Sequence, residues 1–187
     1  EYDAVIYNVA ATAESLAKKE VSQNKITDDL AVDLDTDVWQ LMLDTNVTPV
    51  FKLVSGIYSF LNSEKGVRPL RLRKVIVTSS IYGRAVPDFN LYTNSKNVTY
   101  PGYGASKAAL EYLVRWSAAF FGDYGVNFNC VALGGVFNGH SQEFEKAYSE
   151  RVALKRMARK NDIQGIYPFL LSQHASFITG QIIRVDG

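Results

Sequence analysis

Tyr103 and Lys107 stand four residues apart in the stretch YGASKAAL. Residues i and i+4 of a helix share a face, so the phenol and the ammonium would be neighbours on a helix. A phenol has an ordinary pKa of about 10, but a neighbouring cation stabilises the phenolate and lowers that pKa. Such a phenol can pass a proton to or from a carbonyl or alcohol oxygen while a nicotinamide moves hydride at the carbon. The pair is therefore a candidate acid–base group, although this spacing is also common on solvated helices.

A second pair with the same spacing, Tyr92 and Lys96, competes for this role in the stretch YTNSKNVTYPG. Its threonine, asparagine and serine residues favour turns, and a proline follows, so a helix is not expected there. The alanines and the leucine of YGASKAAL favour a helix. We therefore interpret Tyr92 and Lys96 as a chance match on a loop.

Other polar residues and glycines fall at the ends of predicted strands or on the helices that follow, where an α/β sheet places its functional groups. A serine hydroxyl there can donate a hydrogen bond to a substrate oxygen. Glycines let the backbone approach a ligand closely, and an asparagine beside a proline bend can satisfy backbone groups that the bend frees. Each residue alone also has a structural explanation as a cap, turn or packing residue. The set comprises Asn8, Asn46, Ser79, Ser80, Gly134 and Gly135.

The elements that must position these residues alternate between strands and helices. Short apolar runs predict buried parallel strands, and apolar spacings of three and four predict helices. Pro49 should bend the first long helix, and residues 84–102 read as a loop. This order predicts a single α/β domain over 1–187, a doubly wound parallel sheet with helices on both faces. The expected strands are 3–9, 73–80, 126–133 and 180–187, and the expected helices are 35–63, 103–125, 141–154 and 161–172.

The composition narrows the partners and the compartment. The net charge of +1 gives no electrostatic reason to expect nucleic acid, and no apolar run approaches the ~20 residues that span a membrane. The single cysteine, Cys130, lies in an apolar run, so we expect it to be a buried residue without a disulfide partner in the chain. A reducing cytoplasm is the compartment that this predicts. No residue is assigned to a metal.

With these residues in view, the sequence resembles the short-chain dehydrogenase/reductase family along nearly its whole length. The match rests on segments that correspond to the family's N-N-A-G element, helix asparagine, active-serine strand, Y-x-x-x-K motif, N-x-V-x-P-G-x-x-x-T stretch and C-terminal strand. Leu133 and Asn138 replace the proline and threonine of that stretch. The segments are YNVAA, DTNVTPVF, VTSSIYG, YGASKAAL, NCVALGGVFN and FITGQIIRVDG.

The resemblance implies an NAD- or NADP-dependent oxidoreductase that interconverts a carbonyl and a secondary alcohol. Tyr103 would be the acid–base, Lys107 would lower its pKa and bind the nicotinamide ribose, and Ser80 would hold the substrate oxygen. Asn46 would hold a water that relays protons to Lys107. The cofactor would also be lined by Asn8, Ala10, Gly134 and Val136.

Two departures from the family pattern carry further expectations. The stretch DFNLYTNSKN separates Ser80 from Tyr103 by more than is typical, which indicates an insertion beside the substrate entrance. Its aromatic and amide side chains, Phe89, Asn90, Tyr92 and Asn94, suit a polar substrate such as a sugar or sugar nucleotide, and an ordinary surface loop is the alternative. Together with the run that begins LGGVFN, the stretch resembles family members from flagellin-modification and sialic-acid-like sugar pathways. The family's glycine-rich first βα units have no counterpart in this sequence, so we expect this chain to be a fragment, or its first part to have been cleaved or omitted.

Three functional classes stay open. A non-catalytic scaffold or an inactive fragment on the same fold is the main alternative to the oxidoreductase. A serine hydrolase is less favoured because no G-x-S-x-G elbow is present. The resemblance also implies a homodimer or homotetramer that pairs the helices near 36–62 and 103–122.

Overall fold

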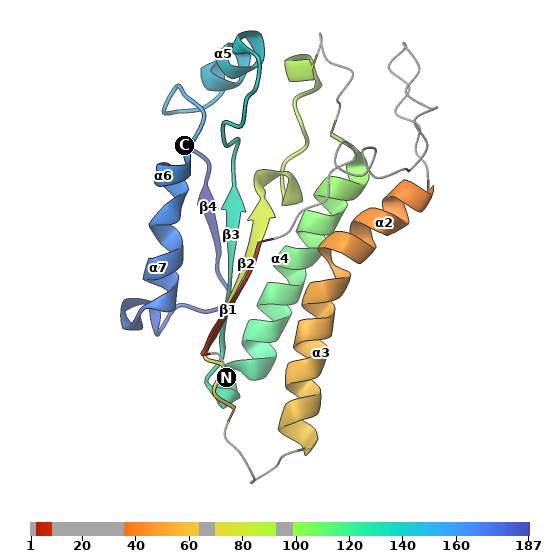
Figure 1. The fold of residues 1–187 in the computed structure, drawn as a ribbon, viewed down its shortest axis with the longest axis vertical. Helices are drawn as coiled ribbons and strands as arrows, with labels where there is room; N and C mark the ends of the chain where they lie inside the picture. The colour runs from red at the N-terminus through yellow and green to blue at the C-terminus, as the bar shows by residue number, and fades with distance from the viewer. Residues whose placement is uncertain (1–2, 9–35, 64–69, 93–98) are drawn as a thin grey trace.

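The computed structural model describes residues 3–8, 36–63, 70–92 and 99–187. Within them four strands form one parallel sheet in the order β1-β2-β3-β4. The strands all point toward the end of the molecule where α5 lies (Figure 1). Their bounds are β1 Ala4–Tyr7, β2 Lys74–Ser80, β3 Asn127–Leu133 and β4 Ile182–Val185. The predicted parallel α/β sheet is thus confirmed, with β1 and β4 shorter than expected.

Helices cover both faces of this sheet, as predicted. The helices α3 (Thr48–Ser63) and α4 (Pro101–Phe121) lie on one face, and α6 (Lys160–Gln164) and α7 (Ile166–Leu171) on the other (Figure 1). Alternate residues of β2 point to opposite sides. Val75 and Val77 therefore join the core under α3 and α4, while Ile76 joins the core under α7.

The predicted bent helix over 35–63 is instead two helices, α2 (Thr36–Asn46) and α3. Pro49 is the cause, because proline has no N–H to donate to the carbonyl four residues earlier. That carbonyl belongs to Thr45, and the Tyr7 hydroxyl donates to it at 2.9 Å. The break in the helix is therefore tied to the end of β1.

The remaining helices also differ from prediction at their ends. The α4 helix begins at Pro101, inside the predicted loop, since proline suits the first helical position. The helix expected over 161–172 is divided into α6 and α7, and the 141–154 helix is shorter. Its bounds are α5 Gln142–Glu150, and the short 3-10 helices are η1 Ile81–Gly83, η2 Phe89–Tyr92, η3 Gly122–Tyr124 and η4 Gln173–Ala175.

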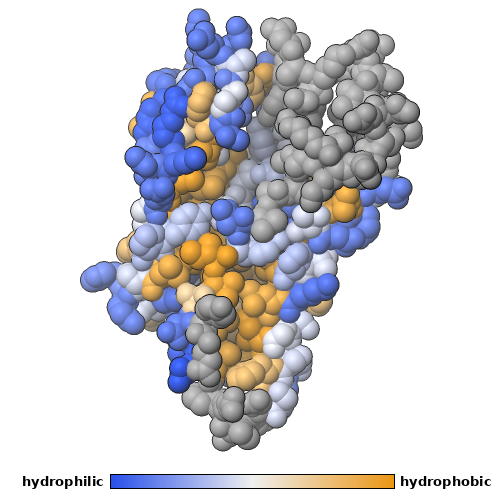
Figure 2. All heavy atoms as spheres, in the orientation of Figure 1, coloured by the Kyte–Doolittle hydropathy of each residue, from blue (hydrophilic) through white to orange (hydrophobic). Residues whose placement is uncertain are grey.

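The β1 strand is at an edge of the sheet in the described part of the chain, where it pairs only with β2. Apolar side chains gather on the surface around this strand in Figure 2. Ile6 of β1 is 45% exposed there. The prediction of a single domain over 1–187 extends beyond the described ranges and stays a prediction.

Candidate functional site

A cavity of about 240 Å³ opens at the carboxyl ends of β1, β2 and β3. Six of the residues predicted for catalysis or cofactor binding line it: Asn8, Ser80, Tyr103, Lys107, Gly134 and Val136. Thr78, Ser79 and Leu133 complete the lining. A cavity at this edge of a parallel sheet is where α/β proteins bind their ligands. The sequence analysis did not name Thr78, although its place in strand 73–80 could have indicated it.

The α4 helix brings the tyrosine–lysine pair to this cavity. Tyr103 lies in its first turn, where its N–H donates to the carbonyl of Tyr100 at 3.0 Å. Lys107 lies one turn further, with Nζ 5.5 Å from the centroid of the Tyr103 ring. For the rival pair, Tyr92 ends η2, but its side chain and Lys96 lie outside the described residues, so its interpretation as a chance match stays a prediction.

Lys107 places an ammonium group inside the protein, where the residue is only 1% exposed. Burial lowers the pKa of Lys107 from 10.5 to about 8, because the charged form loses its hydration. Its Nζ donates to the carbonyl of Thr78 at 3.4 Å. At neutral pH the group still carries its proton, so a cation stands beside the phenol.

The two serines at the end of β2 have different partners. Ser79 donates its hydroxyl to the carbonyl of Lys107 at 3.2 Å, which ties the strand to α4. Ser80 caps η1, because its Oγ accepts the N–H of Tyr82 at 3.2 Å. An oxygen that accepts in this way keeps its own proton for donation. Both serines line the cavity, and the assignment of Ser80 as the serine that holds the substrate oxygen stays a prediction.

Two glycines let η1 lie directly against α4. A Cβ on Gly104 would meet the carbonyl oxygen of Tyr82 at 2.8 Å. A Cβ on Gly83 would meet the backbone carbon of Lys107 at 3.1 Å. Because no larger residue fits at either place without a shift, the serine-bearing turn and the tyrosine-bearing helix keep a fixed separation.

Asn46 is fully buried at the end of α2 but is not among the residues that line the cavity. Its Nδ2 donates to Ser106 Oγ at 3.0 Å, and that hydroxyl donates to the carbonyl of Tyr103 at 2.7 Å. The asparagine is thus bonded to α4 between Tyr103 and Lys107. The water relay that the resemblance assigns to it stays a prediction.

The glycine turn after β3 is covered by the segment that contains α5. The N–H of Gly135 donates to the Tyr148 hydroxyl at 2.5 Å. Two further rings pack in a row next to this tyrosine. The ring centroids of Phe144 and Tyr148 are 6.1 Å apart, and the His140 ring stacks on Phe144 with the centroids 5.0 Å apart. The sequence analysis did not single out Tyr148, although the aromatic spacing of four in EFEKAY was visible.

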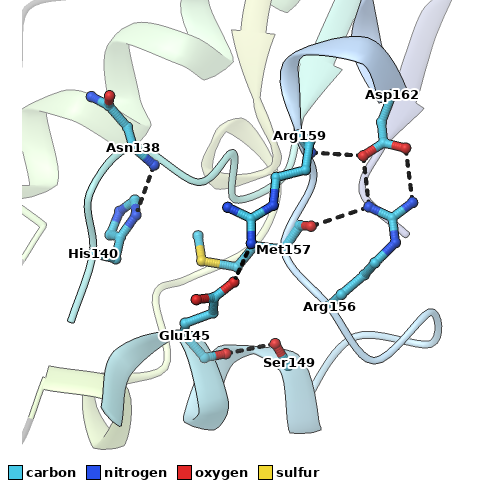
Figure 3. A network of polar contacts seen from close by, with 8 residues as sticks. All are labelled: Asn138, His140, Glu145, Ser149, Arg156, Met157, Arg159 and Asp162. Carbon is cyan, nitrogen blue, oxygen red and sulfur yellow. Dashed lines mark hydrogen bonds and ion pairs between the residues drawn. The ribbon is translucent and has the colours of Figure 1, made fainter. Parts of the chain in front are cut away.

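Two ion pairs connect α5, the loop that follows it and α6 (Figure 3). Arg156 makes a two-pronged contact to Asp162 at 2.6 and 2.8 Å, and Arg159 contacts Glu145 at 2.8 Å. The Arg156 guanidinium holds the pKa of Asp162 below its usual range. Arg159, the N-cap of α6, therefore joins α6 to Glu145 of α5.

Two positions named in the sequence analysis add no contact to the cavity. Ala10 lies outside the described residues. Asn138 is exposed, and its N–H donates to His140 Nδ1 at 3.2 Å rather than toward the cavity. Leu133, the other departure from the family pattern, lines the cavity.

Neither a metal cluster nor a membrane-spanning helix is found among the residues that the structure describes. No three His, Cys, Asp or Glu side chains there are grouped as metal ligands would be. None of the helices there combines the length and the apolar character needed to cross a bilayer.

A family model described as enoyl-(acyl carrier protein) reductase matches residues 4–187. The chain therefore belongs to this family of short-chain dehydrogenases/reductases, as its motifs predicted. It is 33% identical over 112 residues to the post-translational flagellin modification protein A of Campylobacter coli. That alignment covers 60% of this chain and 44% of the relative, and it agrees with the narrower resemblance drawn from the sequence.

Another relative and a solved structure are also dehydrogenases. The chain is 29% identical over 157 residues to a 2-dehydro-3-deoxy-D-gluconate 5-dehydrogenase of Pseudoalteromonas atlantica, covering 81% of this chain and 56% of that protein. A short-chain dehydrogenase of Leptospira borgpetersenii with bound NAD+ has a TM-score of 0.75 at 22% identity, covering 99% of this chain and 63% of that one. The chain thus spans about half to two thirds of the length of these proteins.

Proposed function

We propose that the protein is an NAD(P)-dependent oxidoreductase that interconverts a carbonyl and a secondary alcohol. One observation carries this proposal: Ser80, Tyr103 and Lys107 border the same cavity, with Lys107 as a buried cation beside the Tyr103 ring. A proton donor, a hydrogen-bond donor and a cation are what reduction of a carbonyl requires from the protein.

In the direction of reduction, the Tyr103 hydroxyl gives its proton to the carbonyl oxygen as that oxygen gains negative charge. Ser80 donates a hydrogen bond to the same oxygen, because its Oγ already accepts from Tyr82 and its proton remains available. Lys107 stabilises the phenolate that is left, by its charge. Oxidation of an alcohol is the reverse of these steps.

The residues fit the nicotinamide half of a dinucleotide. Asn8 follows β1, and Gly134 and Val136 follow β3, so they line the cavity from the two sides of β2 and offer an amide and an open stretch of backbone. NAD or NADP bound there would supply or accept the hydride. Lys107 reaches the same cavity from α4 and is the group expected to hold the ribose hydroxyls.

We propose a sugar or a sugar nucleotide as the substrate. The support comes from two relatives, one named for flagellin modification and one for a deoxygluconate. It also comes from the insertion, where Phe89 is 55% exposed and Asn90 is exposed on η2. An aromatic face and an amide suit a polar ring. The other two insertion residues give no support, since the Tyr92 side chain and Asn94 lie outside the described part.

The test is oxidation of NADH and NADPH, followed by absorbance, in the complete protein as its gene encodes it. The carbonyl panel should contain keto sugars, keto acids of sugars and simple ketones. Tyr103→Phe should lower kcat by about 10²-fold or more, since a positioned acid contributes that much. Tyr112→Phe is the matched control, because this tyrosine is 63% exposed on the same helix. Equal rates for Tyr103→Phe and wild type would refute the acid–base assignment and favour a scaffold.

We further propose that two copies pair through α3 and α4 in a homodimer or homotetramer. Large aromatic side chains stand on the outer surfaces of these helices, with Trp116 43% and Phe120 41% exposed. The two rings stack at 4.9 Å, and Tyr58 of α3 lies 5.9 Å from Phe120, so they form one patch. Light scattering should give a multiple of the monomer mass, and Trp116→Arg should give the monomer. A wild-type monomer at high concentration would refute the pairing.

A cytoplasmic location is part of the same proposal. It is supported by the one cysteine of the chain, the buried free Cys130. A reducing compartment suits such a protein. Cell fractionation tests it.

A further inference from the structure

One carboxylate inside the protein has no part in the chemistry described so far. Glu111 lies on α4 one turn beyond Lys107, and its side chain is only 2% exposed. Its Oε2 accepts from Arg84 Nε at 2.6 Å. In the described part of the chain its Oε1 is buried and has no hydrogen-bond partner. Burying a carboxylate with one oxygen unsatisfied is unfavourable, so this arrangement is not explained by stability.

The partner of Glu111 stands at the end of the turn that carries Ser80. Arg84 is the C-cap of η1, where its N–H donates to the carbonyl of Ile81 at 3.0 Å. Ser80 is the N-cap of the same turn. Since η1 has only three residues, a bond that fixes its far end also fixes the position of the Ser80 hydroxyl.

The unsatisfied oxygen points to the same turn. A Cβ added to Gly83 would meet Oε1 of Glu111 at 3.0 Å, so the carboxylate lies against this glycine. Glu111 thus touches η1 through a salt bridge on one oxygen and through packing on the other.

We propose that Glu111 is a positioning residue, which holds η1 on α4 through Arg84 and so sets Ser80 relative to Tyr103. This proposal rests on the proposed function, because Ser80 matters only if it holds the substrate oxygen. Three further contacts along α4 act in the same way: those of Gly104 with Tyr82, Ser79 with Lys107, and Gly83 with Lys107. Among these contacts, the hydrogen bond from Arg84 to Glu111 is the one made by a buried carboxylate side chain.

The test compares Glu111→Leu, Glu111→Gln and Arg84→Met in the complete protein. Glutamine keeps an oxygen that can accept from Arg84 Nε, whereas leucine keeps only the volume. Val114→Ala is the matched control, because Val114 is buried on the same helix but packs into the core under α3 and α4. It should lower stability without moving η1.

Two readouts are expected to change together. Hydrogen exchange of the Tyr82 and Arg84 amides should accelerate about tenfold in Glu111→Leu and Arg84→Met, relative to wild type and to Val114→Ala. The kcat should fall about tenfold or more while the KM for NAD(P)H stays within about twofold, because the cofactor wall is untouched. Glu111→Gln should recover most of both losses. The double variant Glu111→Leu/Arg84→Met should lose no more than either single variant.

Unchanged amide exchange in Glu111→Leu would overturn the proposal, whatever the activity does. A glutamine variant as impaired as the leucine variant would also overturn it, since the anchor would then not be a hydrogen bond. If exchange accelerates but wild type shows no Tyr103-dependent turnover, the proposed function fails while the anchoring of η1 by Glu111 is supported.

Discussion

Replacing Lys107 with methionine should make the protein more stable at neutral pH while it abolishes the proposed reaction. The lysine is 1% exposed, and burial lowers its pKa from 10.5 to about 8. Keeping it protonated at pH 7 therefore works against folding. Methionine has a similar length and no charge, so it should fill the same space.

The magnitude follows from that pKa. A fall from 10.5 to about 8 corresponds to about 3 kcal/mol of lost stability at pH 7. Methionine also loses the hydrogen bond from Nζ to the carbonyl of Thr78, which is long at 3.4 Å and worth about 1 kcal/mol. Lys107→Met should therefore be about 2 kcal/mol more stable than wild type at pH 7.

The sign of the pH dependence is fixed by the same values. Between pH 8 and 10.5 the unfolded chain keeps the proton that the folded protein has lost, so wild-type stability rises with pH. The advantage of the methionine variant should therefore shrink by about 2 kcal/mol between pH 7 and pH 9.5.

Urea unfolding of the protein without cofactor, at both pH values, measures these differences. Lys52→Met is the matched control, because it is the same substitution at a lysine that is exposed on α3. A methionine variant that is less stable than wild type at pH 7, or a difference that does not change with pH, would refute the reasoning.

The remaining predictions concern the supports of the site and its pH range. Tyr7→Phe should lower the free energy of unfolding in urea by about 1 kcal/mol, since the Thr45 carbonyl loses its donor; an unchanged value would mean that water replaces the hydroxyl. Gly104→Ala should destabilise by about 1–3 kcal/mol, because its Cβ would lie 2.8 Å from the Tyr82 oxygen, and thermal melting tests this. The kcat of the complete protein should fall above about pH 8 as Lys107 loses its proton, and a profile flat to pH 10 contradicts it.

The sheet and the position of the cavity were predictable because both follow from short-range patterns. Buried parallel strands are nearly continuous apolar runs, and β2 and β3 were found close to their predicted bounds. The functional residues follow those strands, so the common direction of parallel strands brings them to one edge. Tyr103 and Lys107 needed only the helical spacing. The sequence therefore predicted six of the nine residues that line the cavity.

The missed features depend on contacts between distant segments. At Pro49 the sequence predicted only a bend, because the donor that satisfies the freed Thr45 carbonyl is the Tyr7 hydroxyl, 38 residues away in the chain. Tyr148 reaches the glycine turn only because the chain folds back between Gly135 and the start of α5. No local pattern encodes such a return, so these residues could not be assigned from spacing.

The burial of Glu111 also could not be predicted from the sequence. In the sequence it is one charged residue in a long helix, where an exposed position is the ordinary expectation. In the structure it shares the buried face of α4 with Lys107, so one helix carries two buried charges of opposite sign within two turns. A helix selected for stability alone would place apolar residues at both positions. The two buried charges are thus consistent with the proposed roles, in which Lys107 acts on the phenol and Glu111 on the turn that holds Ser80.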